Sequence, residues 1–489
     1  MSKLLAFDLG AESGRAIVGR FDGERLALEE LHRFQNGPVQ IFDRLYWDPL
    51  RLFAEMKQGL ALFAREHGND LAAIGVDTWG VDFALLDSDD ALLDNPRNYR
   101  DPRTDGMLEE AFARMPREEI FAHTGVQFMK LNTLYQLLSL RDSPLLQSAQ
   151  TLLMMPDLFN FYFTGAKVCE FSNATTTQFY DPRQSTWATE LLKSLGLPTH
   201  FLPEIVQPGT QIGTLLPSIA TAAGLEPVPV IAPATHDTGS AVAAVPAATR
   251  DYAYISSGTW SLMGVELDEP LVSDRALQYN FTNEGGVGPT YRFLKNIMGL
   301  WLVQECRRTW AREGRDFSYD DLTAMAQNAA PFSALIEPDD ERFIPPGDMP
   351  ARIRAFCKET SQTIPQDEGQ IIRVVLESLA LKYRYVLNNI ETVLGRRLEV
   401  IHVVGGGIQN RLLCQFTASA AGRPVIAGPL EATAIGNLLL QLMGLGQLAS
   451  LAEARQVVRH SFEPITYQPE QIANWDEAYA RFHPLLPPT

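Results

Sequence analysis

The same short pattern opens each half of this chain of 489 residues: an apolar strand, a turn rich in small residues, and a second apolar strand. The first copy spans residues 4–21 with its turn at Asp8–Gly14, and the second spans residues 252–266 with its turn at Ser256–Thr259. Such a turn points successive backbone N–H groups into a concavity that suits an anion. Two copies so far apart favour two related α/β domains, with the boundary near residue 243.

We expect helices and further strands to follow each hairpin along the sequence. Residues 48–67 carry apolar side chains at three- and four-residue steps, which predicts a helix, and residues 71–77 read as a buried strand. In the second half, residues 368–394 predict a long helix by the same criterion. We therefore expect residues 1–243 to form the first domain and residues 244–489 the second.

Composition excludes several classes of protein. Hydrophobic residues make up 46% and charged residues 20%, as in soluble globular proteins. The formal net charge of -18 repels phosphate backbones and anionic lipid, so we expect neither a nucleic-acid nor a membrane partner. The uncharged stretch 432–452 contains Asn437 and several glycines and predicts a buried helix rather than a membrane span. Four scattered cysteines without a CxxC pair indicate reduced thiols in a cytoplasmic protein.

The first turn contains the residues for a phosphate and a metal ion. Asp8 ends its strand, where it can hold Mg²⁺ or one of its waters, and Arg15 can offset phosphate charge. The alternative is an ordinary hairpin with an exposed salt bridge. The second turn, Ser256–Thr259, favours the interpretation that the first turn binds phosphate, because a nucleotide between two domains needs a phosphate loop from each.

A run of three glycines, Gly405–Gly407, follows an apolar strand and precedes a helix. Backbone without side chains lets a nucleotide lie flat against it, and a helix N-terminus favours an anion. The full G-x-G-x-x-G pattern is missing here, which argues against a nucleotide-dependent dehydrogenase. The absence of G-x-x-x-x-G-K-[ST] from the sequence excludes a P-loop enzyme.

Two further segments carry candidate chemistry. Asp237 precedes a helix of small residues, either as its N-cap or as a general base that orients a hydroxyl and accepts its proton late, and spacing alone favours the cap. Gly75–Phe83 places Trp79 and two acids at a strand end, where ligands bind in α/β folds. Trp79 either stacks on a sugar or belongs to the core, and the core is slightly favoured.

These segments together resemble the FGGY sugar kinases of the actin-like ATPase superfamily, from Phe7 to about Asn437. The resemblance implies two actin-like (ribonuclease H-like) α/β domains flanking a nucleotide- and sugar-binding cleft, the first mainly for sugar and the second mainly for ATP. It is closest to the members that act on L-rhamnulose. Four blocks carry it: Val76–Phe83, Asn173–Gln178, Ser256–Gly264, and Asn283–Gly286 together with Leu294–Trp301.

The activity that the resemblance implies is transfer of the ATP γ-phosphoryl group, with Mg²⁺, to the 1-hydroxyl of L-rhamnulose in L-rhamnose catabolism. The resemblance implies that Asp237 is the catalytic base and that Asp8 is the acid near the metal. It also implies a monomer or a small homo-oligomer. The sugar-binding residues it implies are Gly80, His236, Asp237, Thr238 and Asn296. The ATP-binding residues it implies are Ala11, Glu12, Ser13, Gly14, Arg15, Thr259, Gln304, Gly405, Gly406 and Gly407.

The first turn departs from the family pattern, which has threonine and serine where this chain has Ala11 and Glu12. Backbone N–H groups can replace the hydroxyl at Ala11, whereas Glu12 repels phosphate unless it points outward or faces Mg²⁺. Two alternatives stay open: a kinase of this family for L-fuculose or xylulose, and an actin-like ATPase that is not a kinase. Asp237 and the sugar-pocket blocks argue against the second.

Overall fold

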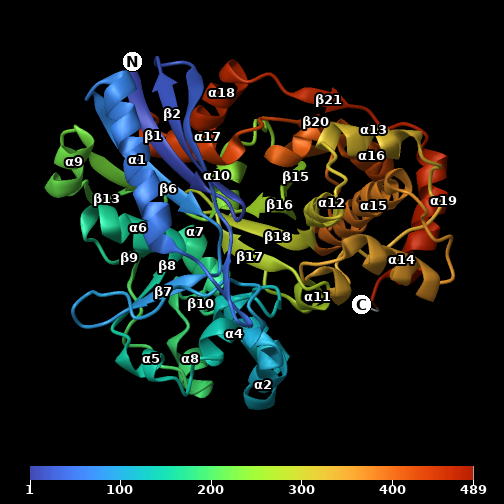
Figure 1. The fold of residues 1–489 in the computed structure, drawn as a ribbon, viewed down its shortest axis with the longest axis horizontal. Helices are drawn as coiled ribbons and strands as arrows, with labels where there is room; N and C mark the ends of the chain where they lie inside the picture. The colour runs from blue at the N-terminus through green and yellow to red at the C-terminus, as the bar shows by residue number, and fades with distance from the viewer. Residues whose placement is uncertain (488–489) are drawn as a thin grey trace. The chain divides into compact units, whose positions relative to one another are not determined.

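The computed structural model describes residues 1–487 and divides the chain into two compact units, each built from three stretches of sequence (Figure 1). Two stretches from the second half of the sequence belong to unit 1, because most of their contacts are with it. These units are defined by contacts, and the division into two domains near residue 243 remains a prediction. Unit 1 consists of Met1–Ala244, Glu266–Phe293 and Ala432–Ser461, and unit 2 of Val245–Val265, Leu294–Glu431 and the chain from Phe462 onward.

Unit 1 is organised around a six-stranded sheet with the order β13-β14-β6-β1-β2-β3. The first three strands along the chain form an antiparallel meander, whereas β1, β6 and β14 run parallel. The central strands are almost continuously apolar because both of their faces are covered. The six strands are β1 (Ser2–Leu9), β2 (Ser13–Phe21), β3 (Leu26–Gln35), β6 (Leu71–Thr78), β13 (Thr210–Thr214) and β14 (Pro229–Ala232).

Helix α1 (Pro49–His67) confirms the helix predicted from periodicity. Asp48 caps it by accepting the N–H of Arg51 at 3.0 Å, and Gly68 ends it with a φ of 79°. Its buried face packs in one core with β1 and β6 and comprises Leu52, Met56, Leu60 and Phe63.

Helix α17 (Ala432–Gly444) comes from late in the chain yet contacts β1, β6 and α10 (Asp237–Ala243) in unit 1. Figure 1 shows it in red beside the blue strands, with α18 (Leu451–Ser461) next to it. A Cβ at Gly436 would lie 1.8 Å from the carbonyl oxygen of Ser240, so only glycine lets α17 and α10 approach so closely. The prediction of a buried helix in this stretch is confirmed.

Unit 1 has a second apolar core that includes Tyr135 and Leu152. The other elements of unit 1 are β4 (Val39–Ile41), β5 (Arg44–Tyr46), β7 (Phe83–Leu86), α2 (Met107–Arg114), α3 (Arg117–Thr124), α4 (Thr133–Leu138), α5 (Pro144–Ser148), β8 (Thr151–Met154), α6 (Met155–Thr164), β9 (Val168–Glu170), α7 (Phe171–Ala174), β10 (Tyr180–Asp181), β11 (Thr186–Trp187), α8 (Thr189–Ser194), β12 (Glu204–Val206), α9 (Pro217–Ala223), α11 (Asp274–Gln278) and β17 (Thr282–Gly285).

Unit 2 contains the strand order β16-β15-β19-β20-β21. β15 pairs antiparallel with β16 and parallel with β19, which confirms the second predicted hairpin. These strands are β15 (Tyr252–Ser257), β16 (Trp260–Leu267), β19 (Val400–Val404), β20 (Val425–Ala427) and β21 (Ile465–Tyr467). The remaining elements are β18 (Tyr291–Met298), which begins in unit 1, and α12 (Trp301–Arg312), α13 (Tyr319–Asn328), α14 (Met349–Glu359), α15 (Glu368–Leu394), α16 (Arg411–Ala421) and α19 (Ile472–Phe482).

The helices and the cysteines bear on the expectations about membranes and thiols. No helix in residues 1–487 combines the length and the apolar character that crossing a bilayer requires. All four cysteines are buried and carry free thiols, in agreement with the reduced state that we predicted.

Candidate active site

A row of charged side chains lies at one end of the central strands of unit 1. The register places Arg15 of β2 opposite Asp8 of β1, and Asp8 beside Asp77 of β6. Residues directly across neighbouring strands share a face of the sheet, so the three side chains are neighbours. Arg15 and Asp8 form an ion pair whose side chains are only 17% and 6% exposed. The alternative of an exposed salt bridge is therefore wrong.

Asp77 is fully buried and was not selected from the sequence as a site residue. Asn437 of α17 donates from Nδ2 to Oδ2 of Asp77 at 2.5 Å, and Oδ1 has no hydrogen-bond partner among residues 1–487. Burial raises the pKa of the Asp77 carboxyl well above its usual value, and the neighbouring Asp8 raises it further. The sequence did contain a signal for Asp77: like Asp8, it is an acidic residue at the end of an apolar strand.

The turn between β1 and β2 is held in shape by Asn36. Asn36 donates from its side chain to the carbonyl of Gly10 at 2.7 Å and from its backbone to that of Glu12 at 3.0 Å. A Cβ at Gly14 would lie 2.2 Å from the ring of Phe34, so this position requires glycine. The turn and the start of β2 contain the predicted ATP contacts Ala11, Glu12, Ser13, Gly14 and Arg15.

Asp237 is the first residue of α10, and the cap position belongs to His236. The interpretation of Asp237 as N-cap is therefore wrong. Its Oδ1 accepts the backbone N–H of Thr238 at 2.5 Å and lies 3.5 Å from Nε2 of His236. One third of the side chain is exposed, and no hydrogen bond reaches Oδ2 from the residues that the structure describes. Burial raises the pKa of this carboxyl, against the opposing effect of His236.

Gly80 lies close to the ring of His236. A Cβ at Gly80 would be 3.3 Å from Nε2 of His236 and 3.1 Å from Cγ2 of Thr176, a residue that the sequence reasoning did not select. Thr176 is itself fixed, because its hydroxyl oxygen accepts the backbone N–H of Val81 at 3.1 Å. Unit 1 therefore brings together four predicted sugar-binding residues: Gly80, His236, Asp237 and Thr238.

Trp79 belongs to the core, as the sequence slightly favoured. Its ring packs against Trp47 with a centroid separation of 4.0 Å. Both indole N–H groups donate to Oδ2 of Asp82, from Trp47 at 2.6 Å and from Trp79 at 3.0 Å. Burial raises the pKa of Asp82 to about 6, although these donors oppose the change. The hypothesis that Trp79 stacks on a sugar is therefore not supported.

In unit 2, the turn between β15 and β16 meets the start of α12. Leu300 donates its N–H to the carbonyl of Gly258 at 3.0 Å, and Trp301 donates to that of Thr259 at 3.1 Å. Gln304 lies one turn further along α12, and its buried Oε1 has no hydrogen-bond partner in the described part of the chain. The structure thus brings the predicted ATP contacts Thr259 and Gln304 to neighbouring segments.

The glycine run lies against the same turn of unit 2. Gly405 has a φ of 85°, and a Cβ at Gly407 would lie 2.0 Å from Oγ of Ser257. A Cβ at Gly406 would have open space within 4 Å, so one side of the run is uncovered. The helix predicted after the glycine run is α16, which begins at Arg411 and is preceded by a 3₁₀ turn over Gly406–Gln409.

Asn296 differs from the other predicted sugar contacts. It lies on β18 in unit 2, whereas Gly80, His236, Asp237 and Thr238 all lie in unit 1.

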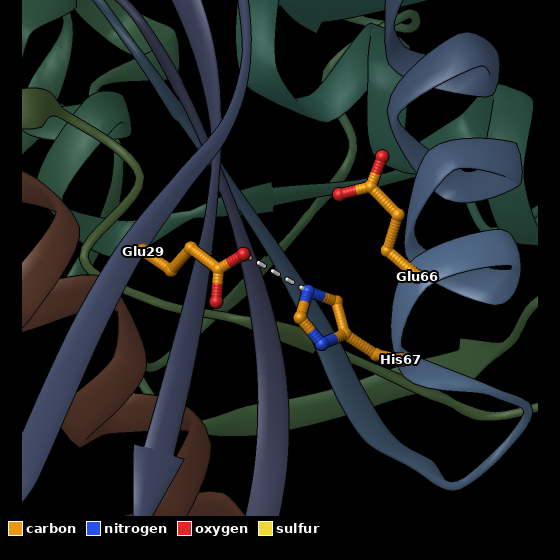
Figure 2. A group of neighbouring side chains, drawn as sticks. All are labelled: Glu29, Glu66 and His67. Atoms are coloured by element: carbon orange, nitrogen blue, oxygen red, sulfur yellow. Dashed lines mark ion pairs between the residues drawn. The ribbon is translucent and has the colours of Figure 1, made fainter.

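One group of three possible metal ligands occurs among the described residues: Glu29, Glu66 and His67. Figure 2 shows Glu29 of β3 paired with His67, at 3.4 Å, while Glu66 extends separately from the end of α1. The guanidinium of Arg20 also pairs with Glu29, so a positive charge already neutralises this carboxylate. This cluster does not include Asp8, and we assign no ion to it.

Comparison with known families and relatives agrees with this geometry. Residues 3–244 match the N-terminal domain, and residues 253–445 the C-terminal domain, of the FGGY family of carbohydrate kinases. A rhamnulokinase of Bacteroides thetaiotaomicron is 47% identical over 480 residues, covering 98% of both chains. A rhamnulokinase of Oceanobacillus iheyensis is 44% identical over 465 residues, covering 95% of this chain and 97% of the relative.

Solved structures of similar fold cover almost the whole chain. A ligand-bound xylulose kinase from Lactobacillus acidophilus superposes with a TM-score of 0.81 at 18% identity, over 99% of this chain and 98% of that one. A Plasmodium falciparum glycerol kinase with ADP gives a TM-score of 0.76 at 16% identity, over 99% and 98%. At such identity the likeness concerns the fold alone, and it confirms the predicted two-domain α/β class.

Proposed function

Because the chain belongs to the FGGY family of carbohydrate kinases, we propose that it phosphorylates L-rhamnulose at the 1-hydroxyl. The products would be L-rhamnulose 1-phosphate and ADP, which places the enzyme in L-rhamnose catabolism. The observation that carries the sugar assignment is the near-complete coverage by rhamnulokinases at 44–47% identity. The observation that supports the chemistry is a partly exposed carboxylate, Asp237, next to His236 and Gly80.

Asp237 acts as the base in this proposal. Phosphoryl transfer needs little proton abstraction early, so the carboxylate orients the 1-hydroxyl and accepts its proton late. Oδ1 is occupied by Thr238, which leaves Oδ2 to accept the hydroxyl. The raised pKa of Asp237 suits this role because it brings the carboxyl closer to the operating pH. Gly80, His236, Thr238 and Asn296 are proposed to contact the sugar.

ATP is proposed to bind through the two turns and the glycine run. The backbone of Ala11–Gly14 would cradle phosphate oxygens, and Arg15 would offset their charge. In unit 2 the uncovered side of Gly406 supports contact with a flat ligand. Thr259, Gln304, Gly405 and Gly407 complete the proposed nucleotide contacts.

Mg²⁺ is proposed as the cofactor, with Asp8 holding it directly or through water. The donor set fits this ion, because Mg²⁺ prefers oxygen ligands and is usually held by one or two carboxylates with phosphates and waters. Asp77 contributes a buried oxygen, Oδ1, that no described residue satisfies, at the same end of the sheet. When bound, the ion would neutralise charge on the transferring phosphates. Glu12 is proposed to face this ion or solvent.

The decisive experiment measures ADP release with ATP and Mg²⁺ across L-rhamnulose, L-fuculose, D-xylulose, glycerol and no sugar. We expect L-rhamnulose to dominate and Asp237→Asn to lose most of the activity. A preference for L-fuculose or xylulose would favour another kinase of this family. Equal ADP release without sugar, or an unimpaired Asp237→Asn variant, would favour an actin-like ATPase that is not a kinase.

The compartment, oligomeric state and partners of the enzyme are also part of the proposal. We propose a cytoplasmic monomer or small homo-oligomer whose partners are ATP and the sugar, without nucleic acid or membrane. The net charge of -18 supports the exclusion of polyanions. Sedimentation at several protein concentrations determines the oligomeric state.

A further inference from the structure

A buried carboxylate, Glu170 at the end of β9, holds the backbone that leads into Asp237. Its Oε2 accepts the backbone N–H of Thr235 at 2.8 Å and the hydroxyl of the same residue at 2.8 Å. Its Oε1 accepts the backbone N–H of Ser172 at 2.9 Å. Glu170, Ser172 and Thr235 are all fully buried, and they belong to unit 1.

Ser172 extends this contact to the next residue along the chain. Its hydroxyl oxygen accepts the backbone N–H of His236 at 3.1 Å. Because a backbone N–H can only donate, the proton of the hydroxyl is left for Oε2 of Glu170, to which Ser172 donates. Glu170 therefore holds two consecutive residues, Thr235 directly and His236 through Ser172.

The carbonyl groups of Thr235 and His236 are bonded as well. The first accepts the N–H of Thr78 at 2.9 Å, and the second accepts the N–H of Gly239 at 2.6 Å. All four backbone groups of this pair are thus satisfied, and both N–H groups are satisfied by side chains. A fully satisfied buried network is rigid, so the backbone directly before Asp237 is fixed in position.

The position of Glu170 requires two acceptor oxygens. One oxygen faces the N–H of Ser172 and the other faces the N–H of Thr235. A glutamine would turn its NH₂ group toward one of these donors in either orientation of the amide. Burial raises the pKa of the Glu170 carboxyl, and its hydrogen bonds to Ser172 and Thr235 oppose this change. Glu170→Gln therefore breaks the contact at one end while it changes the shape of the side chain very little.

The segment that begins at Glu170 also reaches Gly80. Thr176, further along this segment, accepts the N–H of Val81 at 3.1 Å, and a Cβ at Gly80 would lie 3.1 Å from its Cγ2. One short segment thus fixes both stretches of backbone in unit 1 that carry proposed sugar contacts.

The ring of His236 is held by different groups. Arg292 of β18 donates from Nη2 to Nδ1 of the ring at 3.3 Å, and Oε2 of Glu284 of β17 lies 3.1 Å from the same nitrogen. Glu284 and Arg292 also pair with each other at 3.2 Å. A change at Glu170 therefore acts first on the backbone of His236 and not on its ring.

We propose that Glu170 is a positioning residue: through the backbone that it holds, it sets where Asp237 presents Oδ2 to the sugar. Asp237 directly follows this backbone and is the first residue of α10. A displacement of about 1 Å in a catalytic site can cost about a hundredfold in rate. This inference rests on the proposed sugar kinase function.

The first test measures ADP release with L-rhamnulose in Glu170→Gln, alone and combined with Asp237→Asn. We expect Glu170→Gln alone to lower kcat about a hundredfold, with KM for ATP unchanged. If Glu170 acts through Asp237, the same change costs little in the Asp237→Asn background. An equal factor in both backgrounds would overturn the proposal, because a general loss of structure lowers activity with or without the base.

Glu377→Gln is the matched control. Glu377 is also fully buried and accepts a backbone N–H, that of Phe332 at 2.8 Å, but it belongs to α15 in unit 2. We expect kcat of this variant to stay close to that of the wild type. Equal losses of kcat in Glu170→Gln and Glu377→Gln would mean a structural role only and would overturn the proposal.

Ser172→Ala keeps the proposal testable if Glu170→Gln does not fold. This variant removes the link to His236 and leaves Thr235 bonded to Glu170. We expect kcat to fall while KM for ATP stays unchanged. A kcat equal to that of the wild type would overturn the proposal.

Hydrogen exchange without sugar or ATP supplies a readout that does not depend on kinase activity. The amides of Thr235 and His236 should exchange slowly in the wild type and faster in Glu170→Gln, as followed by mass spectrometry of the peptide that contains both. Unchanged protection in the variant would overturn the proposal. A wild type without sugar kinase activity would refute the proposed function, and the exchange result would still show whether Glu170 holds this backbone.

Discussion

Gly407→Ala offers a quantitative test of the nucleotide loop in unit 2. The added Cβ would lie 2.0 Å from Oγ and 2.6 Å from Cβ of Ser257, and 3.0 Å from its carbonyl oxygen. Rotation of the serine hydroxyl relieves the first contact but not the other two, so backbone must move. Overpacking of this kind typically costs about 1–3 kcal/mol of the free energy of unfolding.

The neighbouring position provides the control. Gly406→Ala meets nothing within 4 Å, so we expect no loss of stability from it. If ATP lies on the uncovered side of the run, Gly406→Ala raises KM for ATP without changing the unfolding midpoint. Gly407→Ala raises KM for ATP and lowers the midpoint, while KM for L-rhamnulose stays unchanged in both.

Urea unfolding and initial-rate kinetics on the two variants separate these effects. Combining Gly407→Ala with Ser257→Gly removes the two closest contacts, so the alanine should cost less in the Ser257→Gly background than in the wild type. The reasoning is refuted if Gly407→Ala is as stable as the wild type, or if it costs the same in both backgrounds.

Two further substitutions test unit 1. Gly80→Ala places a Cβ 3.1–3.3 Å from Thr176 and His236. It should therefore raise KM for L-rhamnulose and leave KM for ATP unchanged. Equal changes in both constants would contradict the proposed position of the sugar. Burial raises the pKa of Asp82 to about 6, so the folded protein binds this proton more tightly than the unfolded chain does. The protonated carboxyl therefore stabilises the fold at low pH, and this stabilisation is lost as pH rises from about 4 to 6. Relative to Asp82→Asn, the wild type should lose roughly 3 kcal/mol between pH 4 and pH 7 in urea unfolding, and a difference independent of pH would refute the assignment.

Local chemistry made much of the fold predictable. Helix α1 follows from its apolar spacing and from Asp48 and Gly68 at its ends, and the two hairpins follow from apolar runs around small residues. The error at Asp237 was also local. Cap preference alone could not show that His236 takes the cap position and leaves Asp237 one residue inside the helix.

The surroundings of the candidate site could not be predicted because they depend on contacts distant in sequence. Asn437 reaches Asp77 across 360 residues, and Glu284 reaches His236 from a segment that belongs to unit 1 despite its place in the second half. Neither residue has a periodic or spacing signal that marks it. Glu284 belonged to one of the four blocks and Asn437 to the stretch predicted as a buried helix, and neither had an assigned role.

These distant contacts follow from the electrostatics of unit 1. Asp8 and Asp237 both raise the pKa of Asp77, so gathering these carboxyls is unfavourable unless each is compensated. The partners observed are Arg15 for Asp8, Asn437 for Asp77, and Thr238 with His236 for Asp237. Asn437 comes from a segment far along the chain, as do Glu284 and Arg292 behind His236, and a unit made of residues 1–244 alone would lack all three. The interleaving of the two units in sequence is therefore a condition for holding these acids together in the proposed active site.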